Sequence, residues 1–368
     1  MLKQFGDLEY YSIYEFVADY KEGYLSRRDM MRRVLHIAGG VASAASVLAL
    51  LGCGGQAAPA SAPAASSAAP KPASAAPASV SAVGSTAVSA SAKPAASPAA
   101  SGSAGAKPAA SGSAAASAAP VAKSPLSVAA NDPAIDGKDV TFQGNGATIM
   151  AYEARPKSAG GQLPIVLVVH ENMGLVEHIR DVVRRWAKEG YLAVGVDLLS
   201  RDGGTPKVAA ADASKIPGML STADAVNQAV GDFKAAADYY AKLPGVNPQR
   251  MGLNGFCFGG GVAWRSIEAI STLKAGAPWY GAPPPLDAVR DIKAAVLGVY
   301  SSDSNDFANK DRDQLDAALK AANVTHDFKV YPGTQHAFNN DTSPRYNQEQ
   351  ALVAWKDTQD WFAKYLKA

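Results

Sequence analysis

Hydrophobic and polar positions in the second half of the chain alternate between strand-like and helix-like patterns. Residues 165–169 and 192–196 are continuous apolar runs, which is typical of strands that are buried on both faces of a parallel sheet. Between them, residues 178–188 repeat apolar positions at helical spacing, and glycine follows at position 190. Further helices are expected at 223–243, 260–270, 311–322 and 348–366, and further strands at 251–254, 273–279, 294–300 and 327–331. The alternation predicts an α/β fold with a mainly parallel central sheet and helices on both faces.

A hairpin is expected before this series, and one loop within it. Two short strand patterns, 140–142 and 148–154, flank Gly144-Asn145-Gly146, which is a strong signal for a tight turn. Residues 201–215 show no period and are expected to form a loop. The globular domain is therefore assigned to residues 131–368.

Residues 54–130 have a different composition from the rest of the chain. They are mainly Ala, Ser, Pro and Gly, and their charges come from four lysines. Such a segment has too few large apolar side chains to offset the entropy lost on folding. A disordered linker is therefore predicted at 54–130.

The first 53 residues resemble an export signal. The paired arginines Arg27 and Arg28 precede an apolar stretch at 34–51, and Cys53 follows directly after Leu-Leu-Gly. A twin-arginine-like lipoprotein signal is expected, with Cys53 as the lipidated residue; an uncleaved single-span anchor is the alternative. Both interpretations, the lipoprotein signal and the uncleaved anchor, predict an exported, extracytoplasmic protein attached to the cell membrane, as in a bacterial lipoprotein. Residues 1–25 are given no separate role.

Overall charge and cysteine content exclude several classes of protein. The formal net charge of the 368 residues is +2, and basic residues form no stripe with aromatic ones, so no nucleic-acid partner is expected. The chain has two cysteines, Cys53 and Cys257, in unrelated contexts, which argues against a structural disulfide. Metal-binding and nucleotide-binding motifs are not found in the sequence. Neither a metal nor an organic cofactor is expected.

The segment 251–261 carries the clearest chemical signal. Gly255, Cys257 and Gly259 form a G-x-C-x-G pattern between an expected strand and an expected helix. This pattern is typical of a nucleophile elbow, in which a sharp turn lifts the central side chain clear of the sheet at the N-terminus of a helix. The helix dipole and the free backbone N–H groups favour a thiolate and a neighbouring oxyanion. A buried structural cysteine in a close-packed glycine turn is the alternative.

A thiol nucleophile needs a base and an acid that orients this base. His336 lies on a loop between the last expected strand and the last helix, which is the position of the base in α/β hydrolases. The acid is expected after the strand 294–300, where Asp303 lies nearest the strand end and is preferred. Asp306 is the alternative, since either residue could instead cap a turn or helix.

Taken together, four segments resemble the dienelactone hydrolase family (carboxymethylenebutenolidase-like), which has the α/β-hydrolase fold. They are 170–174 (His-Glu-Asn-Met-Gly), 190–198, 255–260 and 331–338. The resemblance implies a Cys257–Asp303–His336 triad and a role for Glu171 beside the resting thiol. It also implies an oxyanion hole formed by the backbone N–H groups of Phe258 and Asn172.

Substrate-binding residues are less clearly marked. Family members carry an arginine soon after the catalytic histidine, but here Asn340 stands four residues beyond His336, and the next arginine is Arg345. Arg345 and His170 are the candidate substrate-binding residues. The expected function is hydrolysis of a small ester or lactone through an acyl-thioester. A non-catalytic binding lipoprotein and a thioesterase or peptidase on the same fold are the alternatives.

Overall fold

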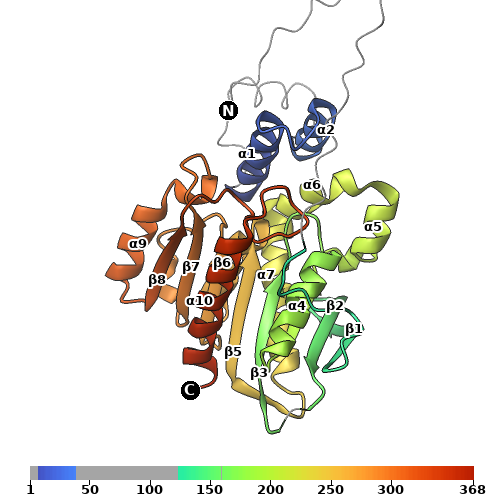
Figure 1. Cartoon of the computed structure of the whole chain (residues 1–368), viewed down its shortest axis with the longest axis vertical. Coiled ribbons are helices and arrows are strands. Elements are labelled where there is room, and N and C mark those ends of the chain that lie inside the picture. The colour runs from blue at the N-terminus through green and yellow to red at the C-terminus, as the bar shows by residue number, and fades with distance from the viewer. Residues whose placement is uncertain (1–6, 39–122, 159) are drawn as a thin grey trace, which may run out of the picture. The chain divides into compact units, whose positions relative to one another are not determined.

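The computed structural model describes residues 7–38, 123–158 and 160–368. Within them, an eight-stranded sheet has the order β1-β2-β4-β3-β5-β6-β7-β8 (Figure 1). The strands are β1 (Ile135–Gly144), β2 (Ala147–Pro156), β3 (Leu163–Val169), β4 (Leu192–Asp197), β5 (Val246–Phe256), β6 (Ala275–Trp279), β7 (Ala295–Ser301) and β8 (His326–Tyr331). β1 and β2 are paired antiparallel, β2 is antiparallel to β4, and the remaining pairs are parallel. The expected mainly parallel sheet is confirmed.

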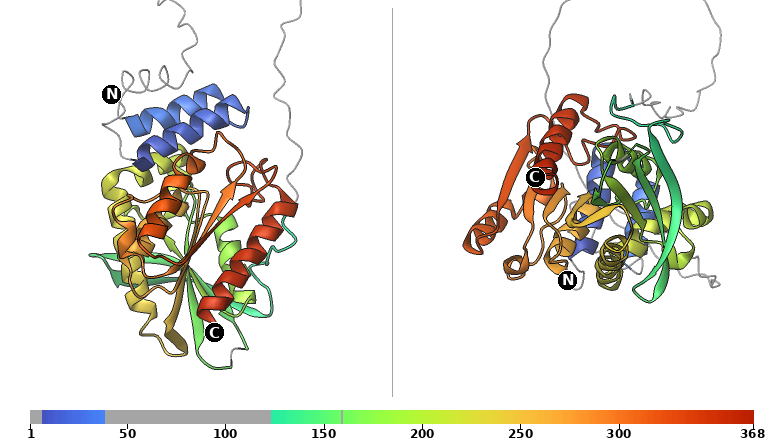
Figure 2. Two further views of the ribbon diagram at one scale, coloured as in Figure 1. Left: turned by 90° about the vertical axis from the view of Figure 1, so that its left-hand side faces the viewer. Right: turned by 90° about the horizontal axis from the view of Figure 1, so that it is seen from below.

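Helices cover both faces of the sheet (Figures 1 and 2). They are α4 (Glu177–Lys188), α5 (Thr205–Asp212), α6 (Ile216–Ser221), α7 (Ala223–Tyr240), α8 (Phe258–Ala269), α9 (Arg312–Ala321) and α10 (Gln348–Leu366). Short 3₁₀ helices are η2 (Ser200–Asp202), η3 (Ala213–Lys215), η4 (Val289–Asp291) and η5 (Phe307–Asn309). α4 and α10 share one face, where Trp186 stacks on Phe362 and packs against Trp355. α7 and α8 pack on the opposite face.

Two local expectations differ from the structure. Residues 201–215 are not a loop, because they contain η2, α5 and η3. Their small side chains give no apolar stripe, so the sequence pattern did not reveal the helix. The domain also begins before residue 131. Val128 N–H donates to Asp181 at 2.6 Å, and Arg184 Nε donates to the Val128 carbonyl at 2.6 Å. The end of the expected linker is therefore hydrogen-bonded to α4.

Two helices precede the main domain in the chain: α1 (Asp7–Lys21) and α2 (Arg27–Ala38). They pack on each other through a small apolar cluster formed by Ile13, Phe16, Val17, Met30 and Val34. Leu8 and Tyr11, on another side of α1, belong to the core of the main domain. Residues 7–21, which the sequence left without a role, therefore form a helix with two buried faces.

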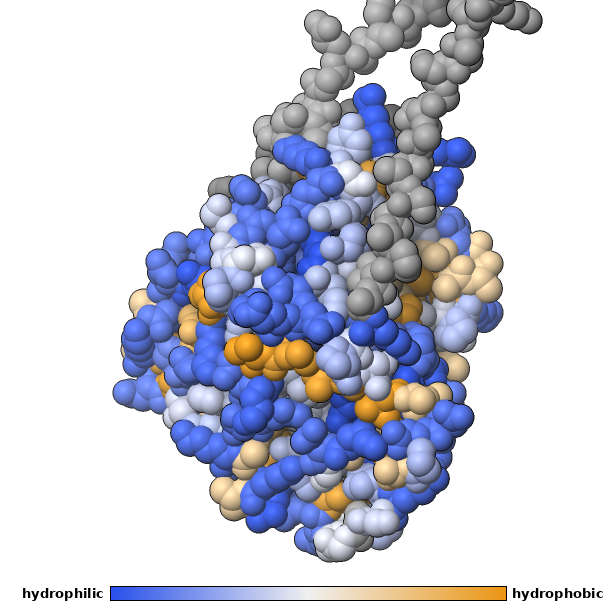
Figure 3. Space-filling view, viewed as in Figure 1, coloured by the Kyte–Doolittle hydropathy of each residue, from blue (hydrophilic) through white to orange (hydrophobic). Residues whose placement is uncertain are grey.

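Most of the predicted signal and linker lies outside the described residues. This includes Cys53, most of the apolar stretch 34–51 and the segment 54–122. Among the described residues, no helix is both long and apolar enough to cross a membrane. The face shown in Figure 3 is mainly hydrophilic, with apolar side chains in small patches. Lipidation and membrane attachment remain predictions.

Candidate active site

Cys257 lies at a strained turn between β5 and α8. Its backbone has φ 58° and ψ −123°, a conformation that is unusual for a residue with a side chain. The flanking glycines are required by space: a Cβ on Gly255 would lie 2.1 Å from the Gly259 carbonyl oxygen, and a Cβ on Gly259 would lie 2.3 Å from the His170 carbonyl oxygen. The expected elbow geometry is thus present, with Cys257 directly before the first residue of α8.

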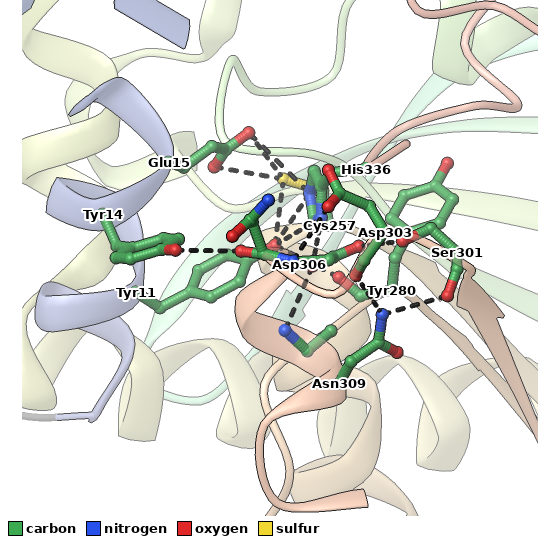
Figure 4. Close-up of polar contacts among 12 residues, drawn as sticks. Tyr11, Tyr14, Glu15, Cys257, Tyr280, Ser301, Asp303, Asp306, Asn309 and His336 are labelled. Atoms are coloured by element: carbon green, nitrogen blue, oxygen red, sulfur yellow. Dashed lines mark hydrogen bonds and ion pairs between the residues drawn. The ribbon is translucent and has the colours of Figure 1, made fainter. Parts of the chain in front are cut away.

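His336 is paired with Asp306 rather than with Asp303. The two side chains meet at 3.1 Å, from His336 Nδ1 to Asp306 Oδ1 (Figure 4). Asp306 is buried, and Ser301 Oγ donates to its other oxygen at 2.6 Å. Asp303 instead accepts a hydrogen bond from the Asn305 N–H at 2.8 Å. The preferred acid Asp303 is therefore corrected to the alternative, Asp306. A turn after β7 carries Asp303 away, and Asp306 comes back to the sheet edge at the start of η5.

The charge of Asp306 controls the protonation of His336. Burial lowers the pKa of the imidazole, but the Asp306 charge, its hydrogen bond and the Glu15 charge outweigh burial and raise the pKa from 6.5 to about 9. Burial also raises the pKa of Asp306, and there the interaction with His336 prevails, so its pKa is lowered. At neutral pH the pair is thus an imidazolium facing a carboxylate.

The thiol of Cys257 faces a carboxylate from α1. Sγ lies 3.4 Å from Glu15 Oε1 and 3.5 Å from Oε2, and one ring nitrogen of His336 lies within 4.8 Å of the sulfur. Burial, followed by the charges of Glu15 and Glu171, raises the pKa of the Cys257 thiol well above its ordinary value. The resting nucleophile is therefore a protonated thiol.

Glu171 lies near the thiol, but Glu15 occupies the position expected for it. Glu171 Oε2 accepts a hydrogen bond of 2.6 Å from Asn340 Nδ2, and Oε1 is buried with no hydrogen-bond partner among the described residues. Burial raises the pKa of Glu171. Asn340, at the position where family members were expected to carry an arginine, thus binds Glu171 directly.

Two of the remaining predicted residues, Asn172 and Arg345, line a pocket beside the thiol. The Phe258 N–H lies at the Cys257 sulfur and lowers the pKa of the thiol, against the larger effect of burial. The Asn172 side chain is buried and donates to Glu15 Oε2 at 3.0 Å. A pocket of about 320 Å³ is lined by Cys257, Asn172 and Arg345, among other residues.

His170 has a structural position. Its Nδ1 lies 2.7 Å from the Glu171 carbonyl oxygen, and its Nε2 accepts from the Leu198 N–H at 3.2 Å. Burial lowers the pKa of His170, which fits a neutral imidazole with its proton on Nδ1. The side chain therefore ties the end of β3 to the end of β4 and shapes the pocket without facing it.

Arg345 is occupied by acidic residues of the N-terminal helices. It pairs with Asp19, and its Nε lies 3.1 Å from Glu22 Oε2. The guanidinium also lies over the ring of Tyr24, at 4.9 Å from its centroid. As the chain is folded, Arg345 holds the end of α1 rather than leaving its guanidinium free for a substrate.

No sequence pattern marked Tyr11 and Glu15 as site residues. Tyr11 Oη lies 2.8 Å from His336 Nε2 and donates to the Tyr280 carbonyl at 3.1 Å. Because the Tyr11 hydrogen is used there, His336 Nε2 is the donor, in agreement with its raised pKa. Glu15, Cys257 and His336 also offer three donor atoms within 4.8 Å of one another, a set that could bind a divalent cation. Their mutual contacts account for the arrangement without one.

Comparison with known proteins identifies the family. The profile described as "Dienelactone hydrolase family" matches residues 149–366, more than half of the chain. A protein of Salmonella typhi named "Putative carboxymethylenebutenolidase" is 36% identical over 255 residues, covering 66% of this chain and 92% of its own length. A protein of the same name from Escherichia coli strain K12 is 35% identical over 260 residues, covering 66% and 94%.

Solved structures agree with this assignment. A crystal structure described as "Putative Dienelactone Hydrolase" from Klebsiella pneumoniae is 34% identical, with a TM-score of 0.56, and covers 63% of this chain and 100% of its own. Its likeness extends over a domain with the α/β-hydrolase architecture seen here. The chain therefore belongs to the dienelactone hydrolase family.

Proposed function

We propose that the protein hydrolyses carboxylic esters or lactones through an acyl-thioester on Cys257. The observation that carries this proposal is the buried Asp306–His336 pair, held at 3.1 Å beside a cysteine at a nucleophile elbow. Family membership supports the reaction class, since the relatives are named for an enzyme that hydrolyses lactones.

The first half of the reaction forms the thioester. The imidazole of His336, in its neutral form, takes the proton of the Cys257 thiol, and the thiolate attacks the ester carbonyl carbon. The N–H groups of Phe258 and Asn172 stabilise the negative oxygen of the tetrahedral intermediate. His336 then protonates the leaving alcohol or, in a lactone, the hydroxyl group that remains attached to the acyl chain.

The second half of the reaction regenerates the thiol. His336 removes a proton from a water molecule, which attacks the thioester carbonyl, and the carboxylic acid is released as the proton returns to sulfur. Asp306 holds the imidazole in orientation and stabilises its charged form through both half-reactions. Glu171 contributes by disfavouring the free thiolate at rest, because its buried charge raises the pKa of Cys257.

The two cysteines of the chain provide a matched pair of variants for testing this chemistry. We expect p-nitrophenyl acetate hydrolysis to fall to the uncatalysed rate in Cys257→Ala and to be unchanged in Cys53→Ala, which removes the other thiol, when all proteins are compared in the same unprocessed form. Equal rates in wild type and Cys257→Ala would reject the nucleophile.

We also propose that the protein is exported and attached to a membrane through a lipid on Cys53. Support comes from the Arg27-Arg28 pair, the apolar stretch 34–51 and the small residues that lead to Cys53. Expression in a bacterium with radiolabelled palmitate should label the wild type and leave Cys53→Ala unlabelled. Equal labelling of both proteins would reject lipidation at this residue.

A further inference from the structure

Helix α1 occupies the position that a substrate needs. Glu15 places its carboxylate 3.4 Å from the Cys257 sulfur, and Tyr11 places its hydroxyl 2.8 Å from His336 Nε2 (Figure 4). These are the two atoms that must face an ester carbonyl and its leaving oxygen. Only 2% of Cys257 is exposed to solvent. While both α1 side chains remain in place, the sulfur and His336 Nε2 face Glu15 and Tyr11 instead of an ester.

Several contacts hold α1 in this position. Leu8 packs against Gly261 of α8, where an added Cβ would lie 2.6 Å from Leu8 Cδ2. Tyr14 Oη donates to the Asn305 carbonyl at 2.9 Å, in the loop that carries Asp306. Asn172 donates to Glu15, and Arg345 pairs with the acids at the far end of the helix. The contacts are specific and are distributed along the whole helix.

The docked helix lies outside the part of the chain that matches the family. The family match begins at residue 149, whereas α1 ends at Lys21 and has a separate apolar cluster with α2. A segment outside the family match therefore fills the active site. The polar groups it brings, a carboxylate to a thiol and a hydroxyl to an imidazole, complement the reacting groups and block them.

We propose that α1 is an autoinhibitory cap, so that the thiol of the intact chain becomes reactive only when Tyr11 and Glu15 leave the site. The proposal rests on the hydrolase function given above. Because α1 precedes Cys53, the cleavage that the sequence predicts before this cysteine removes the cap together with the signal. The unprocessed chain is then closed, its thiol is shielded from oxidation and alkylation, and processing opens the site.

The cap can be displaced in the full chain by reversing the charges that Arg345 holds. In the variant Asp19→Lys/Glu22→Lys, two attractive pairs become repulsive, while every residue of the proposed reaction is kept. The matched control is Asp136→Lys/Asp360→Lys, which makes the same change in net charge at two exposed acids on β1 and α10. Glu15→Ala is a second test variant, which removes the carboxylate at the thiol without changing the Arg345 pairs.

The primary measurement is the rate at which iodoacetamide alkylates Cys257, followed by peptide mass spectrometry so that Cys53 is counted separately. We expect alkylation at least about tenfold faster in both test variants than in wild type and control, because each variant removes contacts that keep α1 over the sulfur: the Arg345 pairs in one and the Glu15 carboxylate in the other. Circular dichroism verifies that each variant is folded. Equal alkylation rates in all four proteins would overturn the cap.

Hydrolysis of p-nitrophenyl acetate by the same four proteins separates this proposal from the hydrolase function. Faster alkylation in the test variants without any hydrolysis would support the cap and reject the enzyme. Rapid Cys257-dependent hydrolysis by wild type, unchanged in the test variants, would overturn the cap and keep the enzyme. Faster alkylation and faster hydrolysis together would support both.

Discussion

Replacing Asp306 by Asn isolates the role of its charge. Asn has the same size and keeps an oxygen to accept the Ala308 N–H, which Asp306 Oδ1 accepts at 3.1 Å. The rise in the His336 pKa from 6.5 to about 9 corresponds to roughly 3 kcal/mol in favour of the imidazolium. Asp306 provides the larger favourable share of this rise and Glu15 a smaller one. We therefore expect Asp306→Asn to slow acylation by roughly a hundredfold.

Asp303→Asn provides the control, because it removes the same charge three residues away. The Asp303 carboxylate accepts a hydrogen bond from the Asn305 N–H, and its loss should leave the rate within about threefold of wild type. Stopped-flow measurement of p-nitrophenolate release gives the acylation rate, and an NMR titration of the His336 ring gives its pKa. Equal losses in the two variants, or an unchanged His336 pKa in Asp306→Asn, would refute the assignment of Asp306.

Two further predictions concern the elbow and the cap. Gly255→Ala should lower the free energy of unfolding by about 2–4 kcal/mol in chemical denaturation, because the new Cβ would lie 2.1 Å from a backbone oxygen of Gly259; an unchanged midpoint would contradict the tight turn. Burial raises the pKa of Glu15 from 4.5 to about 7. The docked helix therefore favours the protonated carboxyl group. Docking of α1 should be strongest below pH 4.5 and should weaken as the pH rises through 7. The alkylation rate of Cys257 in wild type, divided by that in Glu15→Gln, should therefore rise between about pH 5 and 8, whereas a flat ratio would contradict the role of Glu15.

Sequence patterns predicted the sheet well because its central strands are buried on both faces and therefore appear as continuous apolar runs. The run at 165–169 is buried on both faces, and β3 is found at Leu163–Val169. The elbow was equally clear, since close packing leaves no space for a side chain at Gly255 or Gly259. These features depend on local physics, namely strand burial and backbone space, which a single sequence displays directly.

The path of one loop decides which aspartate pairs with His336. Asp303 and Asp306 both follow β7, and distance from the strand end favoured the first. The turn in which the Asp306 N–H donates to the Asp303 carbonyl at 3.1 Å decides which side chain returns to His336. Such a turn is set by tertiary contacts, including the Asn309 side chain donating to the Asp303 carbonyl at 2.8 Å, and spacing along the chain cannot reveal it.

Helix α1 was missed because it has two buried faces and polar residues in one of them. Ser12 and Glu15 interrupt the stripe that Leu8 and Tyr11 begin, so no single apolar period appears. Glu15 fits there because this stripe packs against the active site, where Asn172 donates to its carboxylate and the Cys257 thiol contacts it. The resemblance to known relatives gave no help, since it starts well after α1.

The central claim is that Cys257 carries the acyl group. Mixing the protein with p-nitrophenyl acetate, quenching with acid during turnover and mapping the peptides by mass spectrometry tests it directly. The account predicts one acetyl group on the Cys257 peptide, removable by hydroxylamine and not formed in Cys257→Ala. An acetyl group confined to another residue, or steady hydrolysis with Cys257 unmodified, would contradict it.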